Sequence, residues 1–256
     1  MGPLLSGGLL LAWLLSLAVL FGAGVQRQPW WTALLLVLLR TQLQTGLFIV
    51  AHDAMHRVLW PGRPCCNDAI GRIALALYAG LPFRFCRRQH QRHHRLPASG
   101  LDPDFPSDRR AGVLRWYGQF MAHYLSGRQM LRLVGAWTLL MLLIVFCTSV
   151  APLLAACTVL QFATLPLLLS SLQLFVFGTY LPHRRQRWPE RHAHPASLDL
   201  PPWLSLLACF HFGYHREHHD HPALSWFELP AARARSLPPH AALMAPVASA
   251  AEVSGK

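Results

Sequence analysis

Histidines occur in this chain at spacings that suit metal binding. The sequence has 15 histidines among 256 residues, and imidazole is a common ligand for zinc, copper, iron and nickel. On a helix, offsets of three or four residues place side chains on one face. Three groups have such offsets and together predict a metal centre: His52-Asp-Ala-Met-His56, His90-Gln-Arg-His93-His94 and His215-Arg-Glu-His218-His219.

The number of grouped histidines bears on how many ions are bound. One zinc ion takes about four ligands, and this would leave the other histidines unexplained. The three groups supply eight imidazoles, which is enough for two ions. The sequence has no Glu-x-x-His pair, the motif of carboxylate-bridged iron in soluble helical bundles. The pattern therefore predicts a site built from nitrogen ligands.

Two further histidines are candidates because of their positions. His183 follows the last long apolar run, and we expect it to leave the bilayer at the level of His52. We expect His183 to be a ligand, the alternative being an interfacial hydrogen-bonding residue. His211 lies four residues before His215 and fits either a ligand or a supporting or packing residue. The remaining histidines have no partner at such a spacing, and we expect no metal role for them: His123, His192, His194, His221 and His240.

Carboxylates near the histidines are candidates for orienting them. A ligating imidazole usually donates its second N–H to a carboxylate or a carbonyl, which fixes the tautomer. We expect Asp53 and Asp104 to support the metal ligands in this way. The alternative for each is a solvated surface acid or a helix cap. Three other acids are close enough in sequence to serve: Asp102, Glu217 and Asp220.

The elements that position these residues are expected to be membrane helices. Hydrophobic residues make up 53% of the chain and charged residues 13%, a balance typical of membrane proteins. A helix needs about 20 apolar residues to cross the hydrocarbon core. The first run has no basic segment before it and no cleavage site after it, so we expect it to remain as a membrane helix. Four runs are long enough: residues 4–25, 30–51, 131–150 and 152–180.

Short connections join these runs in pairs. We therefore expect an all-α integral membrane protein with four transmembrane helices in two hairpins and a helical cap that carries the histidines. An even number of crossings places residues 52–130 and 181–256 on the same side of the membrane. They form the cap and the tail of a single membrane domain over residues 1–256.

The arginines indicate which side this is. Most of them lie in or beside residues 52–130, whereas Arg27 lies in a loop on the opposite side. By the positive-inside rule the cap and tail are cytoplasmic. This topology explains the net charge of +12 without nucleic-acid binding.

Two local features of the apolar segments allow alternatives. Residues 68–81 are apolar but too short to span, which predicts an interfacial or a re-entrant helix. Polar residues also interrupt the second span at mid-depth. We expect them to form interhelical hydrogen bonds, the alternative being that they line a substrate channel: Arg40, Thr41, Gln42 and Gln44.

An all-nitrogen metal site at a membrane surface indicates iron that activates dioxygen. Such a site suits a substrate that enters from the bilayer. A metal transporter is an alternative from a different class, but it predicts histidine or ionisable residues inside the spans, and only Arg40 is deep. A purely structural membrane protein gives no reason for eight histidines to gather on one side.

The amino-acid sequences of the motifs, and their order, resemble those of a known family. His52-Asp-Ala-Met-His56 and the two HxxHH groups, in this order on paired hairpins, are similar to the membrane fatty acid desaturase and hydroxylase superfamily. Within it, the chain resembles the bacterial β-carotene ketolases over roughly residues 30–230. The segments that carry the narrower resemblance are Leu77-Tyr-Ala-Gly80, Asp102-Pro-Asp-Phe105, Leu172-Gln-Leu-Phe175, Leu181-Pro-His-Arg184, Pro201-Pro-Trp-Leu-Ser205 and Phe210-His-Phe-Gly-Tyr-His215.

The resemblance implies two iron ions, dioxygen as co-substrate and electrons from a ferredoxin-like carrier. It implies oxidation of the C4 methylene of a carotenoid β-ionone ring to a ketone, giving echinenone and canthaxanthin from β-carotene, and astaxanthin-type products from hydroxylated carotenoids. A bacterial relative implies the inner membrane. A carotenoid ring hydroxylase or a fatty acyl desaturase with the same irons is the alternative. The metal ligands expected from spacing and resemblance together are His52, His56, His90, His93, His94, His183, His215, His218 and His219.

Overall fold

Helices are the only regular secondary structure in the described part of the chain. The computed structural model describes residues 1–256 except 23–24, 26–27, 109, 185–194 and 237–256, so His192, His194, His240, Arg27 and parts of the first predicted span and of the predicted tail lie outside it. No strand occurs among the described residues, as predicted. The elements are α1 (Gly2–Ala18), η1 (Val19–Phe21), α2 (Trp30–His56), α3 (Pro64–Ala79), α4 (Phe83–Arg95), α5 (Val113–Tyr124), α6 (Gly127–Thr148), α7 (Pro152–Val159), η3 (Leu160–Thr164), α8 (Leu165–Leu174), η4 (Phe175–Tyr180), α9 (Leu181–His183), α10 (Pro202–Cys209), α11 (His215–Asp220), η5 (Trp226–Glu228) and α12 (Leu229–Ser236).

Four helical segments are long and apolar enough to cross a membrane. They are Gly2–Phe21, Trp30–His56, Gly127–Thr148 and Pro152–His183, with 20, 27, 22 and 32 residues. The helix that contains the predicted span over residues 152–180 continues without a break to His183. His183 therefore belongs to the helix and does not follow it.

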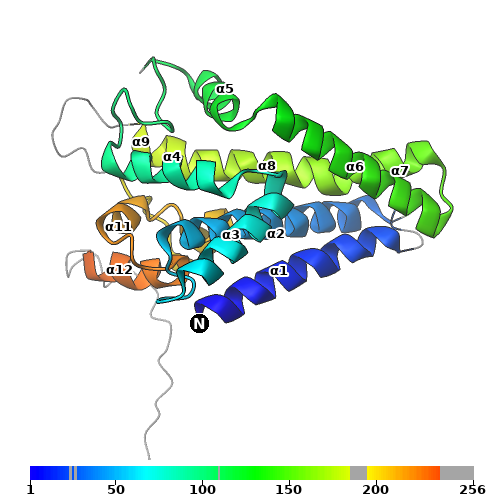
Figure 1. The fold of residues 1–256 in the computed structure, drawn as a ribbon, viewed down its shortest axis with the longest axis horizontal. Helices are drawn as coiled ribbons and strands as arrows, with labels where there is room; N and C mark the ends of the chain where they lie inside the picture. The colour runs from blue at the N-terminus through cyan, green and yellow to red at the C-terminus, as the bar shows by residue number, and fades with distance from the viewer. Residues whose placement is uncertain (23–24, 26–27, 109, 185–194, 237–256) are drawn as a thin grey trace, which may run out of the picture.

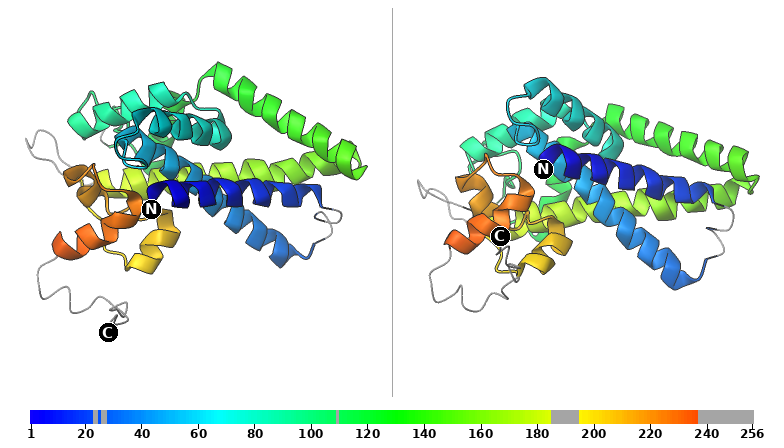
Figure 2. Two further views of the ribbon diagram at one scale, coloured as in Figure 1. Left: turned by 60° about the horizontal axis from the view of Figure 1, so that its bottom comes forward. Right: turned by 90° about the horizontal axis from the view of Figure 1, so that it is seen from below.

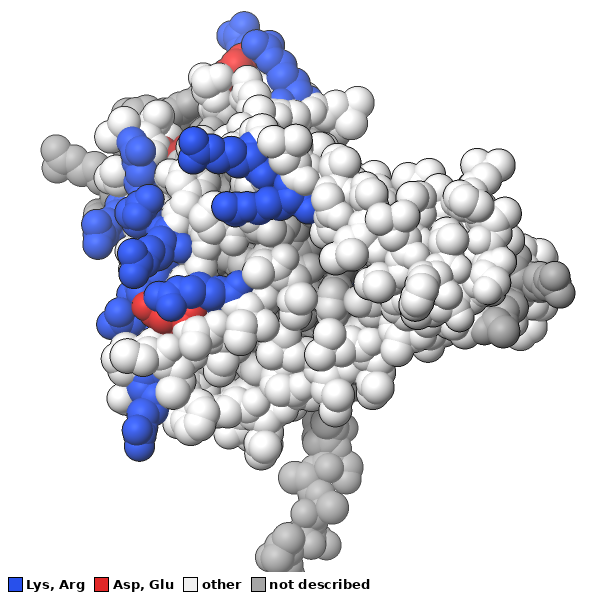
Figure 3. All heavy atoms as spheres, turned by 45° about the vertical axis from the view of Figure 1, so that its right-hand side comes forward, with Lys and Arg blue, Asp and Glu red and all other residues white. Residues whose placement is uncertain are grey.

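The long helices extend away from one end of the molecule, where the shorter helices gather. In Figures 1 and 2, α1 starts near this end, and α2 and α9 finish there, close to α4, α11 and α12. On the face shown in Figure 3, the arginines lie toward the same end, and the opposite part of this face shows no charged side chain among the described residues. Two apolar clusters hold the bundle together, one near this end around Leu47 and Leu75 and one at the far end around Ile144 and Phe162.

The helix α3 packs along the part of α2 that precedes the histidines. It runs beside α2 with Ala74, Leu75 and Tyr78 buried, and the Tyr78 carbonyl accepts a hydrogen bond from Gln44 Nε2 at 2.5 Å. Gln44 lies two helical turns before His52, so α3 reaches well below the histidine level. The chain then turns by 99° into α4. Gly80, at φ +64°, ends α3 in the left-handed conformation that favours glycine.

Polar residues inside the bundle join helices to one another. Arg40 Nη1 donates to Ser16 Oγ at 2.8 Å and its Nε donates to the Phe162 carbonyl. Pro166 explains the second contact, because it has no N–H for the carbonyl four residues earlier, which is that of Phe162. Trp13 Nε1 also donates to Gln44 Oε1 at 2.6 Å. These contacts agree with the predicted interhelical hydrogen bonds.

We predict that Arg40→Met destabilises the protein by roughly 2 kcal/mol, because the Phe162 carbonyl and the Ser16 hydroxyl lose a charged donor inside an apolar bundle. Thermal unfolding of detergent-solubilised protein measures the change. Arg128→Met, at an exposed position of α6, is the matched control and leaves the unfolding temperature unchanged. Equal unfolding temperatures for the two variants would contradict the assigned role of Arg40.

Candidate metal centre

Nine histidine side chains from four helices meet at the end of the bundle. Their ring nitrogens form two groups, in each of which the candidate ligand atoms all lie within 4.8 Å of one another. We call them cluster A and cluster B. Cluster A contains His52, His56, His90, His94 and His218, and cluster B contains His93, His183, His215 and His219. All nine residues singled out in the sequence are thus brought together.

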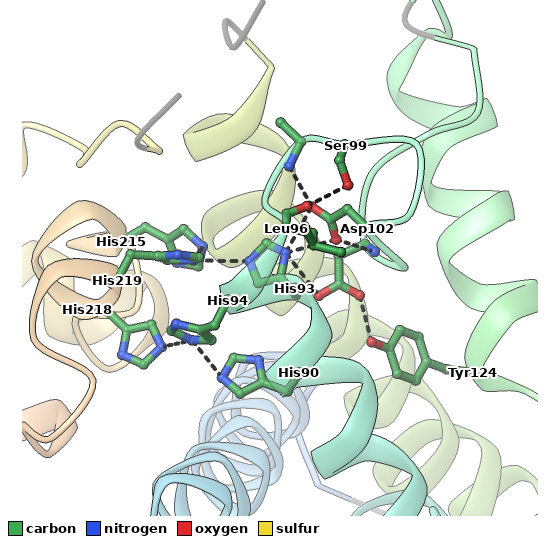
Figure 4. A network of polar contacts seen from close by, with 12 residues as sticks. His90, His93, His94, Leu96, Ser99, Asp102, Tyr124, His215, His218 and His219 are labelled. Atoms are coloured by element: carbon green, nitrogen blue, oxygen red, sulfur yellow. Dashed lines mark hydrogen bonds and ion pairs between the residues drawn. The ribbon is translucent and has the colours of Figure 1, made fainter. Parts of the chain in front are cut away.

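Each HxxHH group divides its imidazoles between the two clusters. In α4, His90 and His94 belong to cluster A and His93 to cluster B, whereas in α11, His215 and His219 belong to cluster B and His218 to cluster A. The i and i+4 side chains therefore face one cluster and the i+3 side chain faces the other (Figure 4). The clusters touch where His94 and His219 stack, with ring centroids 4.2 Å apart.

Cluster A brings Nε2 atoms so close together that a cation is the natural partner. His56 Nε2 lies 2.7 Å from His90 Nε2, and His94 Nε2 lies 3.1 Å from His90 Nε2 and 2.9 Å from His218 Nε2. A neutral imidazole has one N–H and one lone pair, so hydrogen bonds among these rings leave lone pairs facing each other. A positive ion between the nitrogens removes that repulsion.

Cluster B also brings Nε2 atoms close together, and one of its histidines has a defined tautomer. His219 Nε2 lies 3.1 Å from both His93 Nε2 and His215 Nε2. His93 Nδ1 donates to Asp102 at 2.9 Å. A proton on Nδ1 leaves the Nε2 lone pair of His93 directed into the cluster, which is the form that binds a metal.

Burial keeps the histidines of α11 in the neutral state that ligation requires. Removal from water, followed by the charge of neighbouring histidines, holds the pKa of His215, His218 and His219 well below the ordinary value. A neutral ring offers its lone pair without first losing a proton. The donor set therefore fits two metal ions, one for each cluster.

Asp102 is the carboxylate that orients a candidate ligand. Besides His93, it accepts from the backbone N–H groups of Ala98 at 2.7 Å and Asp104 at 2.9 Å. Burial raises its pKa, but the charge and hydrogen bond of His93 outweigh burial and lower it overall. The sequence pattern favours Asp104 over Asp102 because it does not reveal the conformation of this loop. In the loop, the Asp102 carboxylate accepts hydrogen bonds from backbone N–H groups that precede it and follow it in the chain.

Asp53 and Asp104, the two acids expected to support ligands, have other main partners. Asp53 Oδ2 accepts from the Trp226 N–H at 3.1 Å, and its Oδ1 lies 3.4 Å from His52 Nδ1. Asp104 Oδ2 lies 3.9 Å from His93 Nδ1, beyond hydrogen-bond distance. Its Oδ1 accepts from the Tyr124 hydroxyl at 2.6 Å. Burial, with the charge of Asp102, raises the pKa of Asp104 to about 6, against the effects of His93 and Tyr124.

Among the described residues, the other acids and histidines considered in the sequence lie outside the two clusters. Glu217 is buried and pairs with Ser197 and with Arg233 at 3.1 Å, which anchors α11. Asp220 lies 3.5 Å from Arg216. His211 is buried but stacks on Tyr214 and Trp226, with ring centroids 5.7 and 6.2 Å away, which fits the packing alternative. His123 and His221 are exposed.

An apolar cavity opens on both clusters. His52 and His90 of cluster A and His93 and His215 of cluster B line one end of it. Met130 and Leu168 also line it and are 42% and 53% exposed, so the cavity opens at the surface of the bundle. None of Arg40, Thr41, Gln42 and Gln44 lines it. The apolar lining includes Phe48, Met55, Leu133, Trp137, Leu174 and Phe212.

Glycine at position 178 shapes the cavity wall. A side chain there would collide with the ring of Phe212. Phe212 in turn packs edge-on against His52, with centroids 4.7 Å apart. The close approach of the last span to the segment before α11 therefore depends on this glycine.

Comparison with known proteins identifies relatives along nearly the whole chain. The fatty acid desaturase family profile matches residues 28–247. A β-carotene ketolase of Paracoccus sp. (strain N81106) is 41% identical over 237 residues, covering 91% of this chain and 92% of the relative. A β-carotene ketolase of Paracoccus sp. (strain PC1) is 44% identical over 197 residues, with 75% and 76% coverage. A zeaxanthin 4-ketolase of Chlamydomonas reinhardtii is 33% identical over 86% of this chain, which spans 48% of that longer protein.

We predict that His183→Ala lowers the bound metal from two ions per chain to one or fewer, because cluster B loses one of its four nitrogens. Metal analysis of the purified protein measures the loss. His211→Ala, which removes a buried histidine outside both clusters, keeps two ions. Two ions in His183→Ala would remove His183 from the set of ligands.

We further predict that Asp102→Asn weakens metal binding about 10- to 100-fold, because the amide leaves one backbone N–H without an acceptor and holds His93 less firmly. Competition with a chelator measures the affinity. Asp108→Asn, at an exposed acid of the same loop that pairs with Arg115, leaves it unchanged. An unchanged affinity in Asp102→Asn would show that His93 needs no orienting carboxylate.

Proposed function

This chain belongs to the fatty acid desaturase family, and on that premise we propose that it is a carotenoid 4-ketolase. It oxidises the C4 methylene of a β-ionone ring to a ketone, converting β-carotene to echinenone and canthaxanthin, and hydroxylated carotenoids to astaxanthin-type products. The observation that carries the proposal is an apolar cavity that runs from the outer surface to both histidine clusters. The names of the β-carotene ketolase relatives supply the substrate class.

The nine histidines are proposed to hold two iron ions. Imidazole nitrogens suit iron, and the five and four nitrogens of the two clusters match one ion each. When bound, iron supplies the dioxygen activation that an unactivated C–H bond requires. Dioxygen is the co-substrate, and a reduced ferredoxin-like protein is the proposed electron donor. Asp102 supports this chemistry by holding His93 in the tautomer whose Nε2 faces cluster B.

The cavity residues position the ring and exclude water from the site. The Phe212 ring lies against His52 of cluster A and 5.5 Å from His215 of cluster B, measured between ring centroids. Phe48 and Leu174 line the same cavity, and an apolar ring placed among them displaces water. Exclusion of water protects reactive species from side reactions.

The proposed topology places two hairpins in the inner membrane and the histidine cap in the cytoplasm. The four apolar helical segments and their common end, where α3, α4, α11 and α12 gather, support this arrangement. The arginines of that end support its cytoplasmic side. A carotenoid dissolved in the bilayer then enters laterally, past Met130 and Leu168.

We predict that cells which accumulate β-carotene and express this chain form ring ketones, because the cavity presents a ring to both clusters. Chromatography with mass detection identifies the pigments. The His93→Ala variant, which lacks a cluster B nitrogen, forms none. Hydroxylated rings as end products would indicate a ring hydroxylase, and unchanged β-carotene with iron-loaded protein would indicate an acyl substrate.

A further inference from the structure

A hydrogen-bonded acid and phenol lie at the reacting end of the apolar cavity. Asp104 and Tyr124 both line the cavity beside His90 and His93. The Tyr124 hydroxyl donates to Asp104 Oδ1 at 2.6 Å. When the bound ring carries no oxygen, the Tyr124 hydroxyl and the Asp104 carboxylate still have each other as hydrogen-bond partners.

Asp104 is not needed to hold a candidate metal ligand. His93 Nδ1 already donates to Asp102 at 2.9 Å, whereas Asp104 Oδ2 lies 3.9 Å from the same nitrogen. Tyr124 comes from α5, which contributes no histidine to either cluster. A carboxylate carries several acceptor positions, and Tyr124 occupies one of them. The other oxygen of Asp104, Oδ2, has acceptor capacity left, and Asp104 lines the cavity.

The proposed reaction generates a hydroxyl group in this space. In the first round, dioxygen, two electrons and two protons convert the ring CH₂ to CHOH and release one water. The second round consumes the same reactants and gives a geminal diol, which loses water to form the ketone. The ring alcohol between the two rounds bears a polar group in an apolar cavity, and a buried hydroxyl without a partner is unfavourable.

We propose that Asp104, held by Tyr124, accepts a hydrogen bond from the hydroxyl of the half-oxidised ring and retains this ring for the second oxidation. This inference rests on the proposed ketolase function. Asp104 is then a specificity-determining residue for the alcohol and contributes little to the first oxidation, because β-carotene has no oxygen to bind. The expected consequence is that the normal enzyme releases little ring alcohol.

The test compares product ratios of purified, iron-loaded variants during early turnover of β-carotene. Asp104→Leu raises the ratio of 4-hydroxy to 4-keto rings about three- to tenfold, the factor that corresponds to one hydrogen bond. Its KM for supplied 4-hydroxy-β-carotene rises by a similar factor relative to its KM for β-carotene. Asp104→Asn keeps an acceptor oxygen and restores a low ratio. Tyr124→Phe, which removes only the hydroxyl group that holds Asp104, also raises the ratio. It replaces Asp104→Leu in the test if that variant fails to fold.

Tyr117→Phe is the matched control. Tyr117 lies on the same helix, and its hydroxyl contacts Ser171 Oγ at 2.6 Å, so the substitution removes a similar contact away from the histidines. The inference is overturned if Asp104→Leu consumes β-carotene without releasing more ring alcohol, or if Tyr117→Phe releases as much. If the unmodified enzyme oxidises no ring, the proposed function fails. If it forms ketones but the variants do not change the ratio, only the inference about Asp104 fails.

Discussion

Convergence of imidazole nitrogens on two points is the constraint that governs the rest of the molecule. Candidate ligand atoms come from α2, α4 and α11 in cluster A and from α4, α9 and α11 in cluster B. Within each cluster they lie within 4.8 Å of one another, although the helices are far apart in sequence. Neutral rings cannot satisfy so many facing lone pairs by hydrogen bonds alone. The helix ends must therefore be fixed at a common level, and the bundle below them provides that support. The helix α3, packed along α2, and Gly178, packed against Phe212, are parts of this support.

The interior of the bundle follows the same rule that buried polar groups need partners. Two π-helical segments in the last span, η3 and η4, are each followed closely by a proline, Pro166 or Pro182. Because proline lacks an N–H, it disturbs the ladder of the preceding turn. At Pro166 the charged group of Arg40 compensates by donating to the Phe162 carbonyl. A deep arginine in an apolar helix is thus explained by the backbone of its neighbour.

Much of this arrangement can be predicted from the sequence because it depends on local patterns. Run length and hydropathy locate the four long apolar helices, and the i, i+3 and i+4 offsets identify histidines that share a helix face. The division of each HxxHH between two clusters cannot be found in this way, because it depends on how α4 and α11 face each other. For the same reason, the sequence does not show that Asp102, and not Asp104, is the closer carboxylate to His93. It also gives no sign that Tyr124 lies at the site. Tyr124 has no motif, and only the packing of α5 brings it to Asp104.

The shared use of α4 and α11 links the two metal positions thermodynamically. Each of these helices gives imidazoles to both clusters, and His94 of one cluster stacks on His219 of the other. An ion in either position restrains both helices, so the conformational entropy of ordering the second set of ligands is already largely lost. Loading of two ions would then be cooperative, and at half-saturation a chain with a single ion would be a minor form. Cells that supply little metal would accordingly contain a mixture of empty and fully loaded chains instead of a uniform half-loaded population.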